Sequence, residues 1–238
     1  KIRPIVTLVN SREIIESLRV QKSDNEIKIL RGLARQTVRI WESFRKNVRV
    51  GMTEHELASA VDVEIRRGGY YNSFPTIAAV GKNTAFPHAV PGNARLRRAE
   101  HALFDFGIQH EGYCSDLTRI WVKGRISRKI KRLYDAVLLA HDNAIQKLEP
   151  GVRIGDVVKG VNKLLIDKGL GSYICHSLGH GVGLNIHEDP FLREASEEVL
   201  REGMVVTVEP GLYDVRCGGI RIEDMVLITA KGREVLTQ

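Results

Sequence analysis

The chain has 238 residues with a formal net charge of +7, and 43% of its residues are hydrophobic while 27% are charged. This composition is typical of a soluble globular protein with one large core or two small ones. No stretch approaches the ~20 apolar residues of a membrane span, no signal-peptide pattern opens the chain, and three cysteines without a Cys-x-x-Cys pair argue against a disulfide framework. We therefore expect reduced thiols, no membrane association and a cytoplasmic location.

The basic excess lies in the N-terminal part of the chain. Residues 1–50 hold 12 Lys and Arg against 5 Asp and Glu, and the remainder balances. A solvated helix face, or a surface that docks a further domain, explains this better than a nucleic-acid site, so no nucleic-acid partner is expected. Within this part we expect a short strand over Ile5–Val9 and a helical turn capped by Ser11.

Four longer helices are predicted, two in each half of the chain. The first begins at Ser23 and carries apolar residues at helical spacing. The second begins at Thr53, with Glu56 three residues later, which is the pattern of a capping box. In the second half, a helix over 127–148 is followed by another within 149–171 that ends in glycine.

The two halves also share a strand motif. The segments LRRAEHALFDFG and LREGMVVTVEPG align without gaps, which places Leu96 on Leu200, Asp105 on Glu209 and Gly107 on Gly211. Recurrence of helix, glycine, helix and strand predicts a duplicated α+β unit, with pseudo-repeats at about 24–122 and 127–230 around a shared core.

Two hairpins are predicted to bring four acidic residues together. If the first turn centres on residues 110–111, Asp105 pairs with Asp116, and folding the second hairpin about Arg216 pairs Glu209 with Glu223. A register wrong by one residue would instead turn these acids to solvent. Four carboxylates within strands rich in Val, Ile and Leu cannot all be ionised without cations, so the pattern favours two divalent metal ions.

Histidines and an arginine complete the predicted site. His180 lies in the glycine-rich segment SLGHGVGLNIHEDP, from which its imidazole can reach a metal. Oxygen ligands with one imidazole suit manganese, and also cobalt, iron or zinc. His187 and His88 are 99 residues apart, near the repeat offset, and are expected to bind a substrate carbonyl or donate a proton. Arg221, two residues before Glu223, is expected to hold a carboxylate ligand in place.

At these residues the chain resembles the pita-bread metallopeptidases, the group of methionine aminopeptidase, aminopeptidase P and prolidase. The segments that carry the resemblance are DFGIQHEGYCSDLTR, GHGVGLNIHEDP, TVEPGLY and GGIRIED, and it covers about residues 24–232. The segment RIED at residues 221–224 and the pair Pro87-His88, which comes after AAVGKNTA, resemble the proline-specific branch of this group. The implied fold is α+β, with two pseudo-symmetric halves and a curved antiparallel sheet covered by helices.

The resemblance implies a role for each site residue. Asp105 would hold one metal, Asp116 and Glu223 would bridge both, and His180 with Glu209 would complete the other. A bridging hydroxide would attack the scissile carbonyl, with Glu209 as the proton shuttle. The two flanking histidines, His88 and His187, would stabilise the tetrahedral intermediate, and Arg221 would support the ligands.

The implied substrates are small peptides with proline at the second position, cleaved by an aminopeptidase P or, for dipeptides, a prolidase. Full-length members of this branch carry an N-terminal domain before the catalytic one. Residues 1–23 are therefore interpreted as the remnant of such a domain and its connecting helix, and 24–238 as the catalytic domain. A homodimer is expected when the N-terminal domain is present.

Other functions remain open at this point. A methionine aminopeptidase activity and a non-catalytic binding module both fit the fold, although a binding module is expected to have lost metal ligands. A nucleotide-binding loop is disfavoured, because Gly179-His-Gly181-Val-Gly183 lacks both the third glycine of a dinucleotide loop and the lysine of a P-loop.

Overall fold

The computed structural model describes residues 12–238, and the strand and the Ser11 cap expected before residue 12 lie outside this range. The four predicted helices are present, and a shorter helix precedes them. The helices are α1 (Arg12–Val20), α2 (Asp24–Phe44), α3 (Glu54–Arg67), α4 (Arg128–Lys147) and α5 (Ile154–Asp167). No helix within residues 12–238 is long and apolar enough to cross a bilayer.

Local hydrogen bonds explain where these helices begin. The side chains of Ser23 and Thr53 accept from the backbone N–H groups of Glu26 and Glu56, whose carboxylates accept in return from the cap N–H groups. Ser127 caps α4 in the same way, without the reciprocal bond. Because these contacts lie within four residues, the sequence predicts them well.

The strands are short and form four sheets in the described part of the chain. The sheet orders are β2-β3-β6, β1-β4-β5, β10-β11 and β13-β12-β9-β7-β8. The strands are β1 (Tyr71–Asn72), β2 (Ile77–Val80), β3 (His101–Phe106), β4 (Ile108–His110), β5 (Tyr113–Cys114), β6 (Leu117–Val122), β7 (Gly179–Gly181), β8 (Glu188–Leu192), β9 (Val205–Val208), β10 (Gly211–Asp214), β11 (Gly218–Arg221), β12 (Asp224–Thr229) and β13 (Gly232–Val235). Short 3-10 helices lie at η1 (Gly81–Ala85) and η2 (Gly171–Tyr173).

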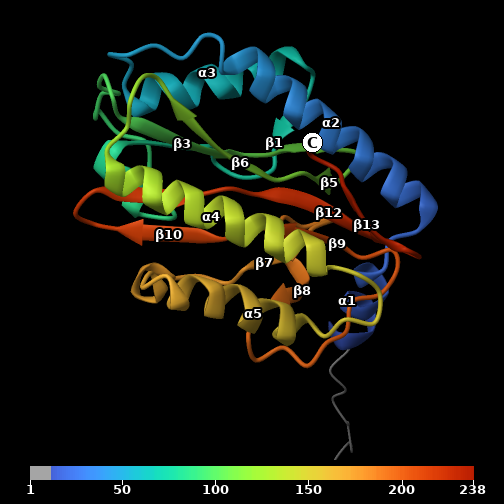
Figure 1. Ribbon diagram of the computed structural model, residues 1–238. Helices are drawn as coiled ribbons and strands as arrows, with labels where there is room; N and C mark the ends of the chain where they lie inside the picture. The colour runs from blue at the N-terminus through green and yellow to red at the C-terminus, as the bar shows by residue number, and fades with distance from the viewer. Residues whose placement is uncertain (1–11) are drawn as a thin grey trace, which may run out of the picture.

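The two halves repeat one another in backbone detail. Gly51 N–H donates to the carbonyl of Leu96 at 2.8 Å, and Gly151 N–H donates to that of Leu200 at 2.9 Å. In Figure 1, α2 and α3 lie together over the strands of the first half, and α4 and α5 lie together over those of the second. The gapless alignment of the two segments is therefore reflected in equivalent contacts.

The apolar core is divided rather than fully shared. One cluster lies between α4, α5 and the strands of the second half, and another lies between α2, α3 and the strands of the first. A smaller cluster joins them, with Leu30 and Ala34 of α2 packed near Cys114, Val205 and Met225. All three cysteines are free thiols, as the sequence predicted.

The first hairpin differs from the predicted register. Asp105 lies opposite Thr118 and not opposite Asp116. The turn is at Glu111 and Gly112, one residue later than predicted, because both residues have positive φ (51° and 84°), as a type I′ turn requires. When the turn moves by one residue, the partner of each strand residue shifts by two positions. A shift of two positions leaves each side chain on the same face of the strand. The carboxylates of Asp105 and Asp116 therefore still point into one cavity.

The second hairpin has the predicted register. Strand β10 pairs with β11, and β9 pairs with β12, so that Glu209 and Glu223 occupy matching positions between the two paired segments. In the first hairpin, Asp116 likewise lies between two strands, β5 and β6. The other arm of that hairpin is interrupted at Gly107, between β3 and β4 and two residues after Asp105. Each hairpin arm thus bends beside an acidic residue.

We expect Gly107→Ala to destabilise the protein by about 3 kcal/mol or more, because a Cβ at this position would overlap the carbonyl oxygen of Ser115. The matched control is Gly32→Ala in the exposed interior of α2, where nothing lies within 4 Å of the added Cβ. That change is expected to stabilise the protein by about 0.5–1 kcal/mol. Urea denaturation measures both, and equal stabilities for the two variants would contradict this account of the bend.

Candidate metal centre

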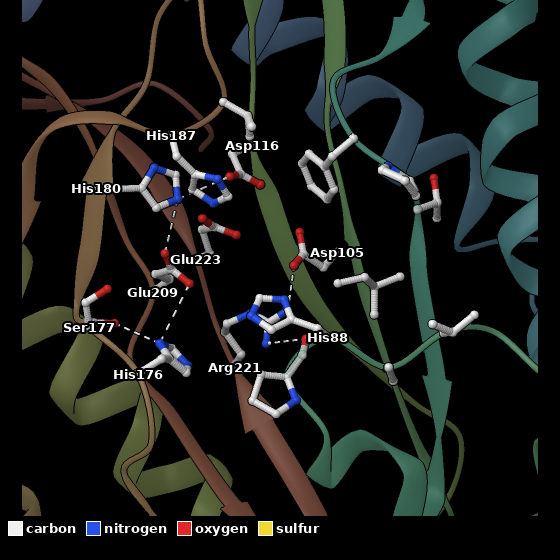
Figure 2. A pocket seen from close by; sticks show the side chains of 18 of the residues that line it. His88, Asp105, Asp116, His176, Ser177, His180, His187, Glu209, Arg221 and Glu223 are labelled. Carbon is white, nitrogen blue, oxygen red and sulfur yellow. Dashed lines mark hydrogen bonds and ion pairs between the residues drawn. The ribbon is translucent and has the colours of Figure 1, made fainter. Parts of the chain in front are cut away.

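A cavity of about 670 Å³ opens where the hairpin bends meet. All eight site residues predicted from the sequence line it, on segments that are far apart in the chain (Figure 2). They are His88, Asp105, Asp116, His180, His187, Glu209, Arg221 and Glu223. The rest of the lining is largely apolar and includes Phe74, Pro75, Ile77, Val90 and Pro91.

His180 is held so that one ring nitrogen faces carboxylates. Its Nδ1 lies 3.0 Å from the carbonyl oxygen of Gly181, and since a carbonyl only accepts, Nδ1 carries the proton. The lone pair of Nε2 then faces Glu209 Oε1 at 3.3 Å and Asp116 Oδ2 at 3.7 Å. A ring nitrogen oriented in this way by a backbone carbonyl is the usual arrangement of a histidine metal ligand.

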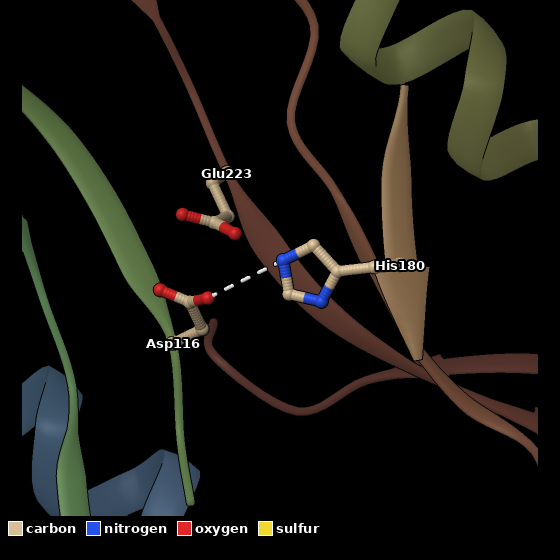
Figure 3. Close-up of side chains that lie close together, drawn as sticks. All are labelled: Asp116, His180 and Glu223. Carbon is tan, nitrogen blue, oxygen red and sulfur yellow. Dashed lines mark ion pairs between the residues drawn. The ribbon is translucent and has the colours of Figure 1, made fainter. Parts of the chain in front are cut away.

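Three side chains converge closely enough to bind one ion. Ligand atoms of Asp116, His180 and Glu223 all lie within 4.8 Å of one another (Figure 3). The Oδ1 atoms of Asp105 and Asp116 are buried without a hydrogen-bond partner. Lone pairs that face one another across a small buried space, with no proton donor between them, are stabilised by a cation. The residues present therefore fit divalent metal ions.

The electrostatics of the site point the same way. Burial, and then the charges of neighbouring carboxylates, raise the pKa values of Asp116 and Glu223 well above their usual range. Burial raises the pKa of Glu209 to about 7, against the opposing charge of Arg221. Burial lowers the pKa of His180 to about 4, so that the imidazole is neutral at pH 7. A neutral imidazole is the form that binds metal.

We expect metal-free protein to become more stable as the pH falls from about 8 to about 6.5. The pKa values of Asp116, Glu209 and Glu223 are raised in the folded state, so their stabilising protonation is lost as the pH rises through those values. Below about pH 6.5 the histidines oppose this trend, because the pKa of His180 is about 4 in the folded state and the unfolded chain is protonated first.

Thermal unfolding at several pH values, with chelator or with Mn²⁺, measures this effect. With metal bound the carboxylates are held ionised, and the slope between about pH 6.5 and 8 is expected to disappear. An equal slope in both samples would mean that these carboxylates do not bind the metal.

Arg221 supports the site through a network that crosses the two halves. Its Nη2 pairs with Asp105 Oδ2 at 2.5 Å, and its Nε donates to Thr118 Oγ1 at 3.0 Å. Thr118 in turn donates to Glu223 Oε2 at 2.7 Å. The predicted role of Arg221 in holding a carboxylate thus applies directly to Asp105 and only indirectly to Glu223. Its positive charge also balances part of the charge of the four acids.

Two further residues of the site were missed from the sequence. His176 Nδ1 lies 2.7 Å from the carbonyl oxygen of Ser177, so its Nε2 accepts from the hydroxyl of Tyr213 at 2.8 Å. That hydroxyl also accepts from Arg221 Nη1 at 2.7 Å. The one available signal was the position of His176, directly before the glycine-rich segment and four residues before His180.

The two flanking histidines lie at the mouth of the cavity. His187 is exposed, and its ring meets that of His180 edge to face with the centroids 4.3 Å apart. Partial burial, and then the charge of His88, lower the pKa of His187. His88 is exposed on the opposite side, in the loop that follows η1. Both are placed to contact a bound molecule.

Several solved structures that resemble this chain are peptidases. X-Pro aminopeptidase from Thermotoga maritima MSB8 superimposes with a TM-score of 0.92 at 32% identity, over 95% of this chain and 64% of that one. Prolidase from Pyrococcus furiosus superimposes with a TM-score of 0.92 at 36% identity, over 95% of this chain and 67% of that one.

A curated relative gives the same result. "Putative dipeptidase YkvY" of Bacillus subtilis (strain 168) is 38% identical over 231 residues, which are 97% of this chain and 64% of the relative. The chain thus spans about 64% of the length of that relative. The model of metallopeptidase family M24 matches residues 28–230. Given this match, and the same fold at 32–36% identity, the chain belongs to metallopeptidase family M24 and has the predicted pita-bread fold.

Proposed function

We propose that residues 24–238 form the catalytic domain of a dinuclear metal-dependent exopeptidase that hydrolyses Xaa-Pro bonds at the N-terminus of peptides. One observation carries the proposal. The converging ligand atoms of Asp116, His180 and Glu223 lie in a cavity whose remaining lining is largely apolar. Such a cavity can bind a small peptide with its scissile bond beside the metal ligands.

In this proposal Asp105, Asp116, His180, Glu209 and Glu223 would hold the two ions, with Asp116 and Glu223 shared between the two sites. Manganese is the proposed metal, since four carboxylates and one imidazole form a hard, oxygen-rich set of ligands. When bound, two such ions would polarise the scissile carbonyl and lower the pKa of a water molecule.

The remaining steps belong to the side chains. Glu209 has a pKa of about 7 in the metal-free site, and its Oε2 faces the His176 ring at 4.0 Å, so it is proposed to move the proton from water to the leaving nitrogen. His88 and His187 bind the substrate carbonyl from the cavity mouth. The apolar wall accommodates the proline ring and excludes water.

Specificity for proline is supported by the relatives. The resembling structures include an X-Pro aminopeptidase, a prolidase and an Xaa-Pro dipeptidase from Bacillus anthracis, the last at 37% identity over 95% of this chain. A cavity lined by three prolines and two phenylalanines suits a ring that lacks an amide N–H. A comparison of the hydrolysis of dipeptides and longer peptides decides which of the two are preferred.

The test is mass spectrometry of the products after Mn²⁺-loaded protein is incubated with Ala-Pro, Ala-Pro-Ala and Met-Ala-Ser. Release of Ala from a proline peptide is expected, and the peptide cut separates a dipeptidase from an aminopeptidase. Release of Met alone would assign the methionine branch. No cleavage by metal-loaded protein would contradict the proposal and favour a binding role.

A further inference from the structure

Glu54 is a buried carboxylate that takes no part in the proposed chemistry. It is the first residue of α3, with 1% of its surface exposed. Its Oε1 accepts from Val80 N–H at 2.9 Å and from Asn83 Nδ2 at 3.0 Å, and its Oε2 accepts from Gly92 N–H at 3.0 Å. All three donors belong to one stretch of chain, and each lies within hydrogen-bonding distance of the carboxylate.

The middle of this stretch forms one wall of the cavity. The loop is taken from Asn83, within η1, to Gly92, and the residues between them that line the cavity are Pro87, His88, Ala89, Val90 and Pro91. Inside the loop, Arg221 donates to the carbonyl of Pro87 at 3.4 Å, which is a long bond. One carboxylate therefore fixes both ends of the segment that carries His88.

We propose that Glu54 is a positioning residue, which fixes the two ends of the 83–92 loop and thereby sets the place of His88 in the cavity. This inference rests on the proposed function for its kinetic consequence, but not for the structural one. A carboxylate suits this place because both of its oxygens only accept, and three N–H groups face it.

Replacing Glu54 with glutamine is expected to weaken the attachment at one end of the loop and to keep the attachment at the other. Its single oxygen satisfies the larger number of donors when it faces Val80 and Asn83, and its amide N–H₂ then faces Gly92 N–H, donor against donor. The helix N-terminus keeps its own contact, because His55 N–H still donates to the carbonyl of Gly92 at 3.1 Å. Glu54→Gln should therefore loosen the exit of the loop without unfolding the domain.

The matched control is Glu64→Gln, the same change on the same helix. Glu64 is 20% exposed, and its carboxylate accepts from Ser43 and Arg67 and from no cavity segment. Hydrogen–deuterium exchange of Mn²⁺-loaded proteins is expected to rise at least about tenfold over residues 86–92 in Glu54→Gln and to stay unchanged in Glu64→Gln. Exchange in α4 and α5 is expected to stay unchanged in both.

Kinetics separate positioning from general damage. With an Xaa-Pro peptide, Glu54→Gln is expected to lower kcat/KM about 10- to 100-fold with unchanged metal content, since displacement of a positioned group by about 1 Å has such effects. In a His88→Ala background the same change is expected to have no further effect, because the group that it positions is already gone.

Two results would overturn the inference. One is unchanged exchange over 86–92 in Glu54→Gln, and the other is a loss of kcat/KM that simply adds to that of His88→Ala. If the unmodified protein cleaves no Xaa-Pro peptide, the proposed function fails, and the exchange data still decide whether Glu54 fixes the loop.

Discussion

Removing divalent metal with a chelator is expected to reduce peptide hydrolysis by at least about 10³-fold, and Mn²⁺ is expected to restore it. The reason is that Glu209, Asp116 and Glu223 converge on a space where His180 presents a lone pair. Without metal, this space holds no divalent cation to polarise the scissile carbonyl and to lower the pKa of a water molecule. Metal content by mass spectrometry and activity on the same samples measure this together.

Substitution of single proposed metal ligands tests the role of each one in metal binding and in activity. Asp116→Asn and Glu223→Gln keep the size of the side chain but remove a negative charge from a site that needs it to hold a cation. Both are expected to bind fewer than two ions per chain and to lose activity in proportion. Asp167→Asn, an exposed acid of α5 paired with Lys163, is the control and should behave as the unmodified protein. Two tightly bound ions in Glu223→Gln would refute the proposed bridging role.

Glu209→Gln is expected to lower kcat by about 10²- to 10⁴-fold while leaving substrate binding nearly intact. The amide oxygen still can bind a metal ion, whereas the amide cannot accept a proton at pH 7. The change therefore separates the two functions proposed for this side chain. Steady-state kinetics with an Xaa-Pro peptide, at measured metal occupancy, give the kcat and the KM separately.

The control for that experiment is Glu202→Gln, an exposed glutamate in the same half of the chain. It should not change kcat, KM or metal content. Full activity in Glu209→Gln, with metal bound, would show that another group moves the proton. His176 would then be the next residue to test, since its ring lies 4.0 Å from the same carboxylate.

The local features of the fold could be predicted from the sequence. The caps at Ser23 and Thr53 depend on groups within four residues, and the apolar stripe of α4 lies on one face because the helical period is fixed. The repeated segments predicted which carboxylates correspond in the two halves. The four acids could be named because buried strands rich in Val and Ile rarely contain charges, and His180 could be named because it lies in a glycine-rich segment.

The register of the first hairpin shows where local patterns fail. Both candidate turns contain Glu111, and alternation of side chains does not distinguish registers that differ by two residues. The positive φ values at Glu111 and Gly112 decide the matter in the structure. The predicted grouping of Asp105 with Asp116 was right nonetheless, because a shift by two preserves the face of the strand.

The helices, the duplicated unit and the identity of the charged residues in the apolar strands could all be predicted from local patterns. Other features came only from the packing of distant segments: Arg221 pairs with Asp105, His176 and Tyr213 join the network, and Glu54 holds the loop of His88. The contacts of Tyr213 with His176, of Glu54 with Gly92 and of Arg221 with Asp105 join residues 37, 38 and 116 positions apart. Such pairs leave no periodic signal, because they depend on how whole elements pack and not on the spacing within one element.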